Sequence, residues 1–399
     1  MKPEFYRKVL DNGMTILFEK RNVPVVSVAI AARCGGMHEE EHEKGISHFI
    51  EHMMYKGTKK RTNKQIAEDI EKRGGDLNGF TDNLITAYWC KMPSKHLGIA
   101  LEVLTDMVKN SLFDSKEMEK ERKVIFEEIK MRKDNPRVYV MDKIHSFLYE
   151  KPFGVNIIGT YESMSSITRE KMLKRFKETY APDKLILAVV GNAEFSEIVD
   201  FAGKNFRGEK GKIKTIKAIP KNEIKTEKRK GVDQANLVFA YHVPVSKDKK
   251  SYAAIVLNTL MADGMSSRLF SEIREKRNLA YAVKGDSEIT NEYAYNVIYV
   301  GTTAEKVDEV KKIILKEFKE VSKKLTEKEL RQVKEQITGN YQISMEDSQS
   351  QLVNLLVYEM DGDSGKFYEF EKAINSVKLE DVKKLADIRN YSFFALLPE

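Results

Sequence analysis

The sequence predicts an α+β protein made of two structurally similar units, each a mostly antiparallel sheet with helices packed on one face. Strand-like and helical segments mix irregularly along the chain, which favours this class over a doubly wound parallel fold. An order of helix, glycine turn, helix and strand in residues 50–81 recurs in residues 259–283. The chain has 399 residues, of which 41% are apolar, so two units with separate cores are feasible.

Turn residues and β-branched runs place the elements of the first half. A strand is expected at 14–18, and a second at 23–31, where Pro24 restricts the first residues to a strand start or an edge. Helical spacing over 65–73 ends at Gly74 and Gly75. Further strands are expected at 77–81, 84–90 and 185–190, and helices from 96 to about 133.

The same signals return in the second half. We expect strands at 236–242, 281–283, 293–300 and 392–397, and helices at 252–261, at 267–276 and then to near 356. Between the halves, residues 210–230 are rich in lysine and lack aromatic side chains, as in a solvated linker. This predicts an N-terminal α+β domain at 1–209 and a C-terminal one at 231–399.

Composition excludes several classes of protein. The net charge of +7 is spread over residues of both signs, and the densest basic stretch, residues 210–230, has no aromatic residues among its lysines, so no nucleic-acid partner is expected. No apolar run approaches the ~18 residues that span a bilayer, and the first residues lack the apolar core of a secretory signal, so no membrane association is expected. Two cysteines, Cys34 and Cys90, make no disulfide framework and fit a reducing compartment, most simply the cytoplasm.

The residues that carry chemistry begin with an H-x-x-E-H motif at residues 48–52. At about 100° per residue, His48, Glu51 and His52 share one stripe of a helix. Two histidines four residues apart can bind one tetrahedral zinc ion, at about 2.0–2.1 Å per nitrogen. Glu51 lies on the same side but off the metal, where a general base can take a proton from a zinc-bound water. The alternative is a helix that happens to expose two histidines.

A helix expected at 117–133 offers the third ligand that a catalytic zinc site needs. Glu121 and Glu128 project onto its apolar stripe, where a carboxylate is costly unless it is paired or binds a metal. Glu127 points elsewhere. From the residues alone, the alternative remains that Glu121 and Glu128 lie at a solvated edge or pair with lysine or arginine.

The segments GISHFIEHMMYKGTKKRT and ERKVIFEEIKMRKDNP together resemble the pitrilysin/insulinase family of zinc peptidases, most of all the branch of the mitochondrial processing peptidases and short prokaryotic homologues. The resemblance covers essentially the whole chain, and Glu128 follows His52 by 76 residues, the family's spacing for the third ligand. It implies one zinc ion per chain on His48, His52 and Glu128. It also implies Glu51 as general base and Glu121 as a group that orients a histidine ligand.

Residues 76–81 resemble the family's active-site edge strand, to which a substrate peptide adds as an extra strand. The resemblance implies substrate contacts from Asn78, Gly79 and Phe80, with Asn78 holding the peptide backbone and Phe80 lining an apolar pocket. Gly79 stands where the family usually has alanine, a change expected to loosen the strand slightly and nothing more.

A segment of the second half, SSRLFSEIREKRNLAYAV, resembles the family's arginine/tyrosine segment. It implies that Arg274 and Tyr281 hold substrate carbonyls and stabilise the tetrahedral oxyanion. The remaining histidines are expected to have no part in the site. His38 and His42 are expected to be exposed, and His96, His145 and His242 to lie at the surface or in the core.

The function expected is therefore a zinc endopeptidase that hydrolyses small or unfolded peptides inside a closed chamber. The family encloses its chamber with four α+β units, and this chain has two, so a homodimer is expected, or a heterodimer with a homologous chain. The alternative is a non-catalytic or partner-dependent subunit of a heterodimeric processing peptidase. The intact His48, Glu51, His52 and Glu128 argue against that alternative.

Overall fold

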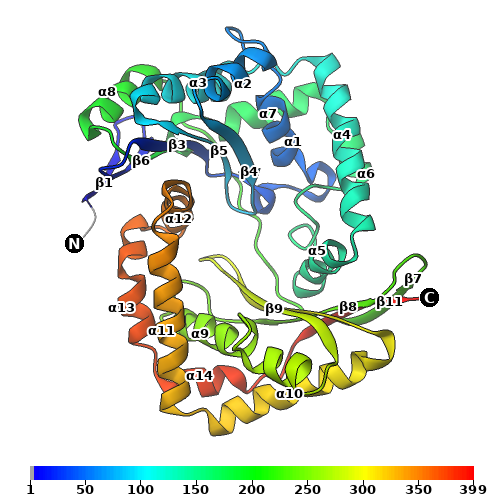
Figure 1. The fold of residues 1–399 in the computed structure, drawn as a ribbon. Helices are drawn as coiled ribbons and strands as arrows, with labels where there is room; N and C mark the ends of the chain where they lie inside the picture. Colours follow the sequence, from blue (N-terminus) through cyan, green and yellow to red (C-terminus); the bar gives the residue numbers. More distant parts are fainter. Residues whose placement is uncertain (1–3) are drawn as a thin grey trace. The chain divides into compact units, whose positions relative to one another are not determined.

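A computed structural model of the chain describes residues 4–399 and confirms the α+β class with two sheets (Figure 1). The chain forms two compact units built from interleaved segments rather than from consecutive halves. Unit 1 contains the N-terminal residues up to Ile129, Val155–Ile216 and Ser344–Tyr368; unit 2 contains Lys130–Gly154, Lys217–Ile343 and Glu369–Glu399. No helix among residues 4–399 is both long and apolar enough to cross a membrane.

The sheet of unit 1 has six strands in the order β1-β2-β6-β3-β5-β4. Only the pair β2–β6 is parallel, so the sheet is mostly antiparallel as predicted. Strand β4 forms one edge and pairs with β5 alone, which leaves its other side without a strand. The strands are β1 (Glu4–Val9), β2 (Thr15–Lys20), β3 (Val25–Ala32), β4 (Asp76–Thr81), β5 (Thr86–Pro93) and β6 (Leu185–Gly191).

A layer of helices covers one face of this sheet. Their apolar stripes bury Phe49, Ile50 and Met53 against strand residues such as Val28 and Ile30. This burial fixes the helix that carries the H-x-x-E-H motif onto the sheet. The helices of this part of the chain are α1 (Ile46–Met54), α2 (Asn63–Glu71), α3 (Leu97–Asn110), α4 (Ser115–Asp134), α6 (Tyr161–Ser166), α7 (Arg169–Thr179) and α8 (Phe195–Asn205).

The other face of the unit 1 sheet is covered by α12 (Ser348–Met360), a helix from the C-terminal part of the chain (Figure 1). Its side chains Leu352, Leu355 and Leu356 are fully buried against the sheet. A buried carboxylate, Glu359, adds polar contacts: it accepts hydrogen bonds from Arg7 at 2.9 Å and from Arg33 at 2.8 Å. Helices were predicted on one face of the sheet, and α12 adds a helix on the second face.

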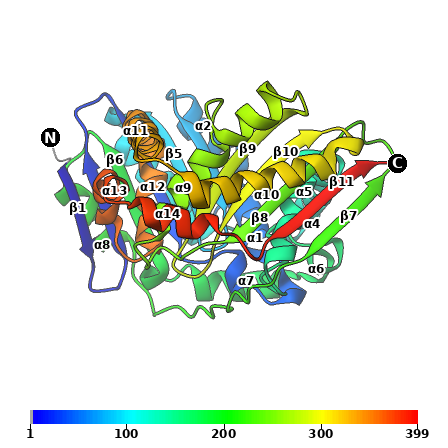
Figure 2. The same ribbon diagram turned by 90° about the horizontal axis from the view of Figure 1, so that it is seen from below.

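Unit 2 repeats this plan with five strands in the order β7-β11-β8-β10-β9. Figure 2 shows β7 and β11 side by side, and this pair is the parallel one. Strand β9 is an edge strand that pairs with β10 alone. The strands are β7 (Ile224–Arg229), β8 (Ala235–His242), β9 (Ala280–Ile289), β10 (Ala294–Thr302) and β11 (Ser392–Pro398).

The helices of unit 2 also come from separate parts of the chain. Helix α5 (Pro136–Leu148) packs on β8 and β11, while α9 (Ser251–Ala262) packs on β9. The helix predicted at 267–276 contains a π-helical turn at Phe270–Glu275. The remaining helices are α10 (Val307–Lys324), α11 (Glu327–Ser344), α13 (Phe370–Asn375) and α14 (Leu379–Ala386).

Two edge strands, β1 and β7, were not among the predicted elements. Both are rich in charged residues and largely exposed, so they lack the apolar alternation that marks a strand in sequence. Strand β7 lies within residues 210–230, the stretch expected to be a solvated linker. It is held there by backbone pairing with β11, a partner about 170 residues away that no local pattern indicates.

Candidate metal centre

Helix α1 begins at a turn whose conformation only glycine adopts readily. Gly45 has φ 95° at the N-cap, in the left-handed region. The carboxylate of Glu39, a residue with no exposed surface, accepts hydrogen bonds from the backbone N–H groups of Gly45 at 3.0 Å and Ser47 at 2.8 Å. These bonds satisfy N–H groups that a helix start leaves unpaired. A negative charge at this position also interacts favourably with the positive end of the helix dipole. Glu39 therefore anchors the start of the motif helix.

The motif histidines and Glu128 of α4 converge on one point. The Nε2 atoms of His48 and His52 are 3.3 Å apart, and Oε2 of Glu128 lies 3.6 Å and 3.8 Å from them. In a tetrahedral zinc site with bonds of about 2.0–2.1 Å, neighbouring donor atoms are ~3.3 Å apart. The three atoms thus form a triangle only slightly wider than a zinc ion requires. Three protein donors leave the fourth position of a tetrahedral site for another molecule.

Residues 4–399 contain one group of three potential metal-binding side chains whose donor atoms all lie within 4.8 Å of one another, and it is this one. The donor set of two imidazoles and one carboxylate suits zinc and other divalent transition metals. The residues present therefore fit the metal that the sequence leads one to expect.

Glu121 holds the second histidine in place. Its Oε2 lies 3.1 Å from Nδ1 of His52, and its Oε1 lies 2.6 Å from Nζ of Lys56. A carboxylate oxygen is a hydrogen-bond acceptor, so we assign the Nδ1 proton of His52 to this hydrogen bond. That assignment leaves the lone pair of Nε2 directed at the donor triangle. Lys56 was not recognised in the sequence, because its partner Glu121 is on another helix.

Glu51 is adjacent to the three donors without being one of the group. The hydroxyl of Thr81 on β4 donates a hydrogen bond of 2.6 Å to its Oε2. Burial raises the pKa of the Glu51 carboxyl, and the negative charge of Glu128 acts in the same direction, while Thr81 and His52 oppose it. A carboxyl with a raised pKa is suited to accept and return a proton near neutral pH. Thr81 was a strand residue in the sequence and gave no signal of this contact.

The edge strand β4 lies directly beside α1. Asn78 is exposed and Phe80 is half-buried, while Gly79 faces the helix. The expectation that Gly79 only loosens the strand is wrong. A Cβ atom built on it would lie 2.5 Å from the Tyr55 hydroxyl oxygen and 2.9 Å from the carbonyl oxygen of Ala87. Side-chain space at this position is occupied, so the glycine is needed for close packing.

Arg274 and Tyr281 lie in unit 2, whereas the candidate metal ligands lie in unit 1. The guanidinium of Arg274 sits in the π-helical turn, 4.9 Å from the ring centroid of Phe270, and 46% of the side chain is exposed. Tyr281 is 50% exposed at the start of β9, with its hydroxyl 3.4 Å from that of Tyr299. Both side chains are therefore accessible to a ligand.

His38 differs from its prediction. It is 6% exposed rather than solvent-accessible, and its Nδ1 accepts a hydrogen bond from the N–H of Gly35 at 3.1 Å. Burial lowers the pKa of His38 to about 4, and the positive charge of Arg175 adds to the effect. His42 is exposed as predicted. The charged residues of this loop favoured a prediction of exposure, but the loop packs against the start of α1.

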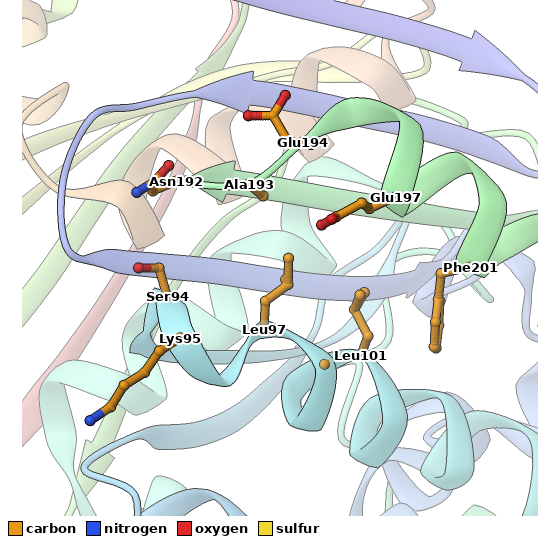
Figure 3. Close-up of a pocket in the computed structure, with 10 residues that line it drawn as sticks. Ser94, Lys95, Leu97, Leu101, Asn192, Ala193, Glu194, Glu197 and Phe201 are labelled. Atoms are coloured by element: carbon orange, nitrogen blue, oxygen red, sulfur yellow. The ribbon is translucent and has the colours of Figure 1, made fainter.

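A separate pocket of about 440 Å³ lies between the start of α3 and α8 in unit 1. Figure 3 shows its lining, which combines apolar Leu97, Leu101 and Phe201 with acidic Glu194 and Glu197. None of the side chains of the metal centre lines it. This pocket is therefore separate from the candidate metal centre at α1, α4 and β4.

The fold and this site have the features of a metal-dependent hydrolase: three side chains that could hold a divalent metal on a helix packed against a sheet edge, with a further carboxylate beside them. Residues 15–161 match the model of the insulinase family, peptidase family M16, and residues 166–337 match the peptidase M16 inactive domain. The chain is 34% identical to the uncharacterized zinc protease YmxG of Bacillus subtilis, over 95% of this chain and 94% of that protein. The chain belongs to peptidase family M16.

Further relatives agree. An uncharacterized zinc protease of Rickettsia felis is 33% identical over 87% of this chain and 85% of its own length. The crystal structure of a protease from Helicobacter pylori superposes with a TM-score of 0.93 at 22% identity, covering 99% of this chain and 100% of that chain. At that identity the likeness establishes the fold, which is the two-domain fold of M16-like peptidases.

Proposed function

We propose that the protein is a zinc-dependent endopeptidase that hydrolyses small or unfolded peptides. The observation that carries this proposal is the donor triangle of His48, His52 and Glu128 with the carboxylate of Glu51 beside it. Membership of peptidase family M16 and relatives named zinc proteases support it. A structural metal site would have no need of a further carboxylate held in place by Thr81.

His48, His52 and Glu128 would hold one zinc ion per chain. When bound, the ion supplies Lewis-acid polarisation of a water molecule and of the scissile carbonyl. The protein's own contribution starts with Glu121, which keeps the His52 ring in one orientation through Nδ1. The Lys56 ammonium, 2.6 Å from the other oxygen of Glu121, holds that carboxylate in place.

Glu51 is the general base. Its carboxylate takes a proton from the attacking water and returns it to the nitrogen of the leaving amine. The raised pKa caused by burial brings the carboxyl closer to neutral pH, where both transfers are feasible. The Thr81 hydroxyl donates to Oε2 and so restrains the orientation of this carboxylate.

A substrate peptide adds to the free edge of β4 as a further strand. Backbone hydrogen bonds bind the peptide with little regard for its sequence, Asn78 holds its backbone, and Phe80 lines a pocket for an apolar side chain. Arg274 and Tyr281, supplied by either copy of the chain, hold substrate carbonyls and stabilise the oxyanion. Their exposure leaves them accessible for this role.

Two copies of the chain would enclose the chamber, as a homodimer. Because the chain carries both the donor triangle and the pair Arg274 and Tyr281, two identical copies suffice. A fully active monomer in light scattering would contradict this pairing. We place the protein in the cytoplasm, since its two cysteines, Cys34 and Cys90, are free and buried.

A second function, a non-catalytic or partner-dependent subunit of a heterodimeric peptidase, has one observation in its favour. Residues 166–337 match a domain described as inactive. That match covers neither the motif helix nor Glu128, so it leaves the candidate metal centre untouched.

The test is cleavage of a mixed peptide library by the purified protein, with and without a chelator, beside Glu51→Gln. We expect chelator-sensitive cleavage by the wild type, none by the variant, and equal zinc in both. The matched control is Glu127→Gln, an exposed carboxylate on α4, which should cleave normally. Cleavage that survives Glu51→Gln would contradict the base assignment, and a zinc-loaded wild type without activity would favour the partner-dependent subunit.

A further inference from the structure

The hydroxyl of Tyr55 is buried against β4, the strand proposed to bind the peptide, without a hydrogen-bond partner among the described residues. Tyr55 follows Glu51 by one helical turn, at the end of α1. Burial raises the pKa of its hydroxyl, and the charge of Glu51 adds to this effect. A buried hydroxyl without a partner costs free energy, so what this side chain adds here is its packing and not a hydrogen bond.

The space taken by this hydroxyl is the space that a side chain at position 79 would need. A Cβ atom on Gly79 would lie 2.5 Å from the Tyr55 oxygen, closer than real Cβ contacts. The large residue on the helix and the absent side chain on the strand are therefore complementary. Either one changed alone leaves a clash or a void.

This contact forms a pair with the hydrogen bond between Glu51 and Thr81. Residues 51 and 55 are about 6 Å apart along a helix, at 1.5 Å per residue. Residues 79 and 81 are about 6.6 Å apart along a strand and face the same side. Two contacts at matching spacing fix both the distance and the tilt between α1 and β4.

We propose that Tyr55 and Gly79 act as a positioning pair that sets the separation between the helix bearing the general base and the strand that binds the peptide. The inference rests on the proposed peptidase function. The scissile carbonyl is positioned by β4, to which the peptide binds. Glu51 and two of the metal ligands are positioned by α1. A misplacement of about 1 Å between them can cost on the order of 100-fold in rate.

The test is a double-mutant cycle of Gly79→Ala and Tyr55→Phe. Gly79→Ala should lower kcat about tenfold or more with KM within about threefold, because the peptide still binds β4 but is displaced from the base. Tyr55→Phe leaves a void the size of one oxygen atom and should lower kcat about two- to fivefold. The double variant should recover kcat to within about threefold of the wild type, because the new methyl group fills that void.

Tyr88→Phe combined with Gly79→Ala is the matched control. The ring of Tyr88 also touches position 79, with Cδ1 3.4 Å from the built Cβ, but its hydroxyl bonds to that of Tyr180 at 2.7 Å. Its removal should give no recovery. Recovery in this control, or a double variant no better than Gly79→Ala, would overturn the proposal.

Thermal unfolding of the metal-free protein gives a second readout that needs no activity. Gly79→Ala should lower the midpoint, and the double variant should unfold at or above the wild-type midpoint, because an unpaired buried hydroxyl has been replaced by a methyl group. A double variant that unfolds with Gly79→Ala would mean that the Ala87 carbonyl, 2.9 Å away, is the real obstacle. An inactive wild type would refute the peptidase function, while the unfolding cycle would still decide the steric pair.

Discussion

The two units share a plan and differ in chemistry. In each, a mostly antiparallel sheet ends in an edge strand, β4 in unit 1 and β9 in unit 2, and a helix packs on that strand. On β4 this helix is α1, with two histidines and a glutamate. On β9 it is α9, whose sequence SYAAIVLNTLMA contains no histidine, cysteine, aspartate or glutamate. The repeated architecture therefore supplies the edge, while the candidate metal centre depends on the side chains of α1 together with Glu128 of α4.

Removing one donor atom of the candidate metal centre should have the largest effect on the chemistry that distinguishes unit 1 from unit 2. Glu128→Gln should lower zinc affinity by more than the roughly 10–100-fold that loss of an outer partner costs, and should abolish hydrolysis. The reason is that two imidazoles alone cannot complete the triangle. Competition with a chromogenic chelator measures the affinity, and Glu127→Gln is the control. A variant that retains wild-type affinity would move the third ligand elsewhere.

A change in unit 2 should affect turnover without affecting the metal. Arg274→Ala should lower kcat about 100- to 1,000-fold, the usual cost of removing one oxyanion donor, while zinc affinity stays unchanged. Steady-state kinetics and chelator competition measure the two effects. If Arg274→Ala lost zinc, or kept full kcat, the assignment of separate tasks to the two units would be wrong.

Glu121 separates orientation from ligation within unit 1. Glu121→Gln keeps the shape of the side chain but loses the charge that Lys56 and His52 face. We expect zinc affinity to fall about 10–100-fold, with activity recovering at high zinc concentration. An affinity equal to that of the wild type would show that the carboxylate charge has no part in holding His52.

The smallest effect concerns acid stability near the start of α1. His38 has a folded-state pKa of about 4 against an ordinary value near 6.5, so the unfolded state binds its proton first as pH falls. The contribution of the neutral His38 to the free energy of unfolding is therefore fully present above pH ~6.5. It is lost as pH falls towards ~4, a change of at most about 3 kcal/mol. His38→Gln should flatten this slope in urea unfolding, and exposed His42→Gln should not. Equal slopes in His38→Gln and wild type would contradict a buried neutral imidazole.

Periodicity made much of the site predictable. The stripe of His48, Glu51 and His52 is local to one helix. Glu128 lies on the apolar stripe of α4, where a carboxylate is costly unless it is paired or binds a metal. The contacts of Thr81 and Lys56 depend on which elements meet in space, which spacing along one element does not reveal. The same holds for Gly79, because its requirement for small size comes from a tyrosine on another element.

The fold shows the same division between local and distant information. Apolar and β-branched runs predicted the central strands, but the charged edge strands β1 and β7 depend on partners far along the chain. Leu352, Leu355 and Leu356 indicate a helix with a buried face, yet nothing in that pattern says that the face lies on the sheet of unit 1. The ion pair between Arg33, which directly follows β3, and Glu359 of α12 shows where this face packs, and it is visible only in three dimensions.

The most direct measurement is the zinc content per chain, by native mass spectrometry of the wild type and His52→Ala after equilibration with zinc. One ion per chain in the wild type and none in the variant is the predicted result, because the donor triangle in unit 1 is the one such group in residues 4–399. Zinc retained by His52→Ala at full occupancy would contradict a metal centre on α1 and α4.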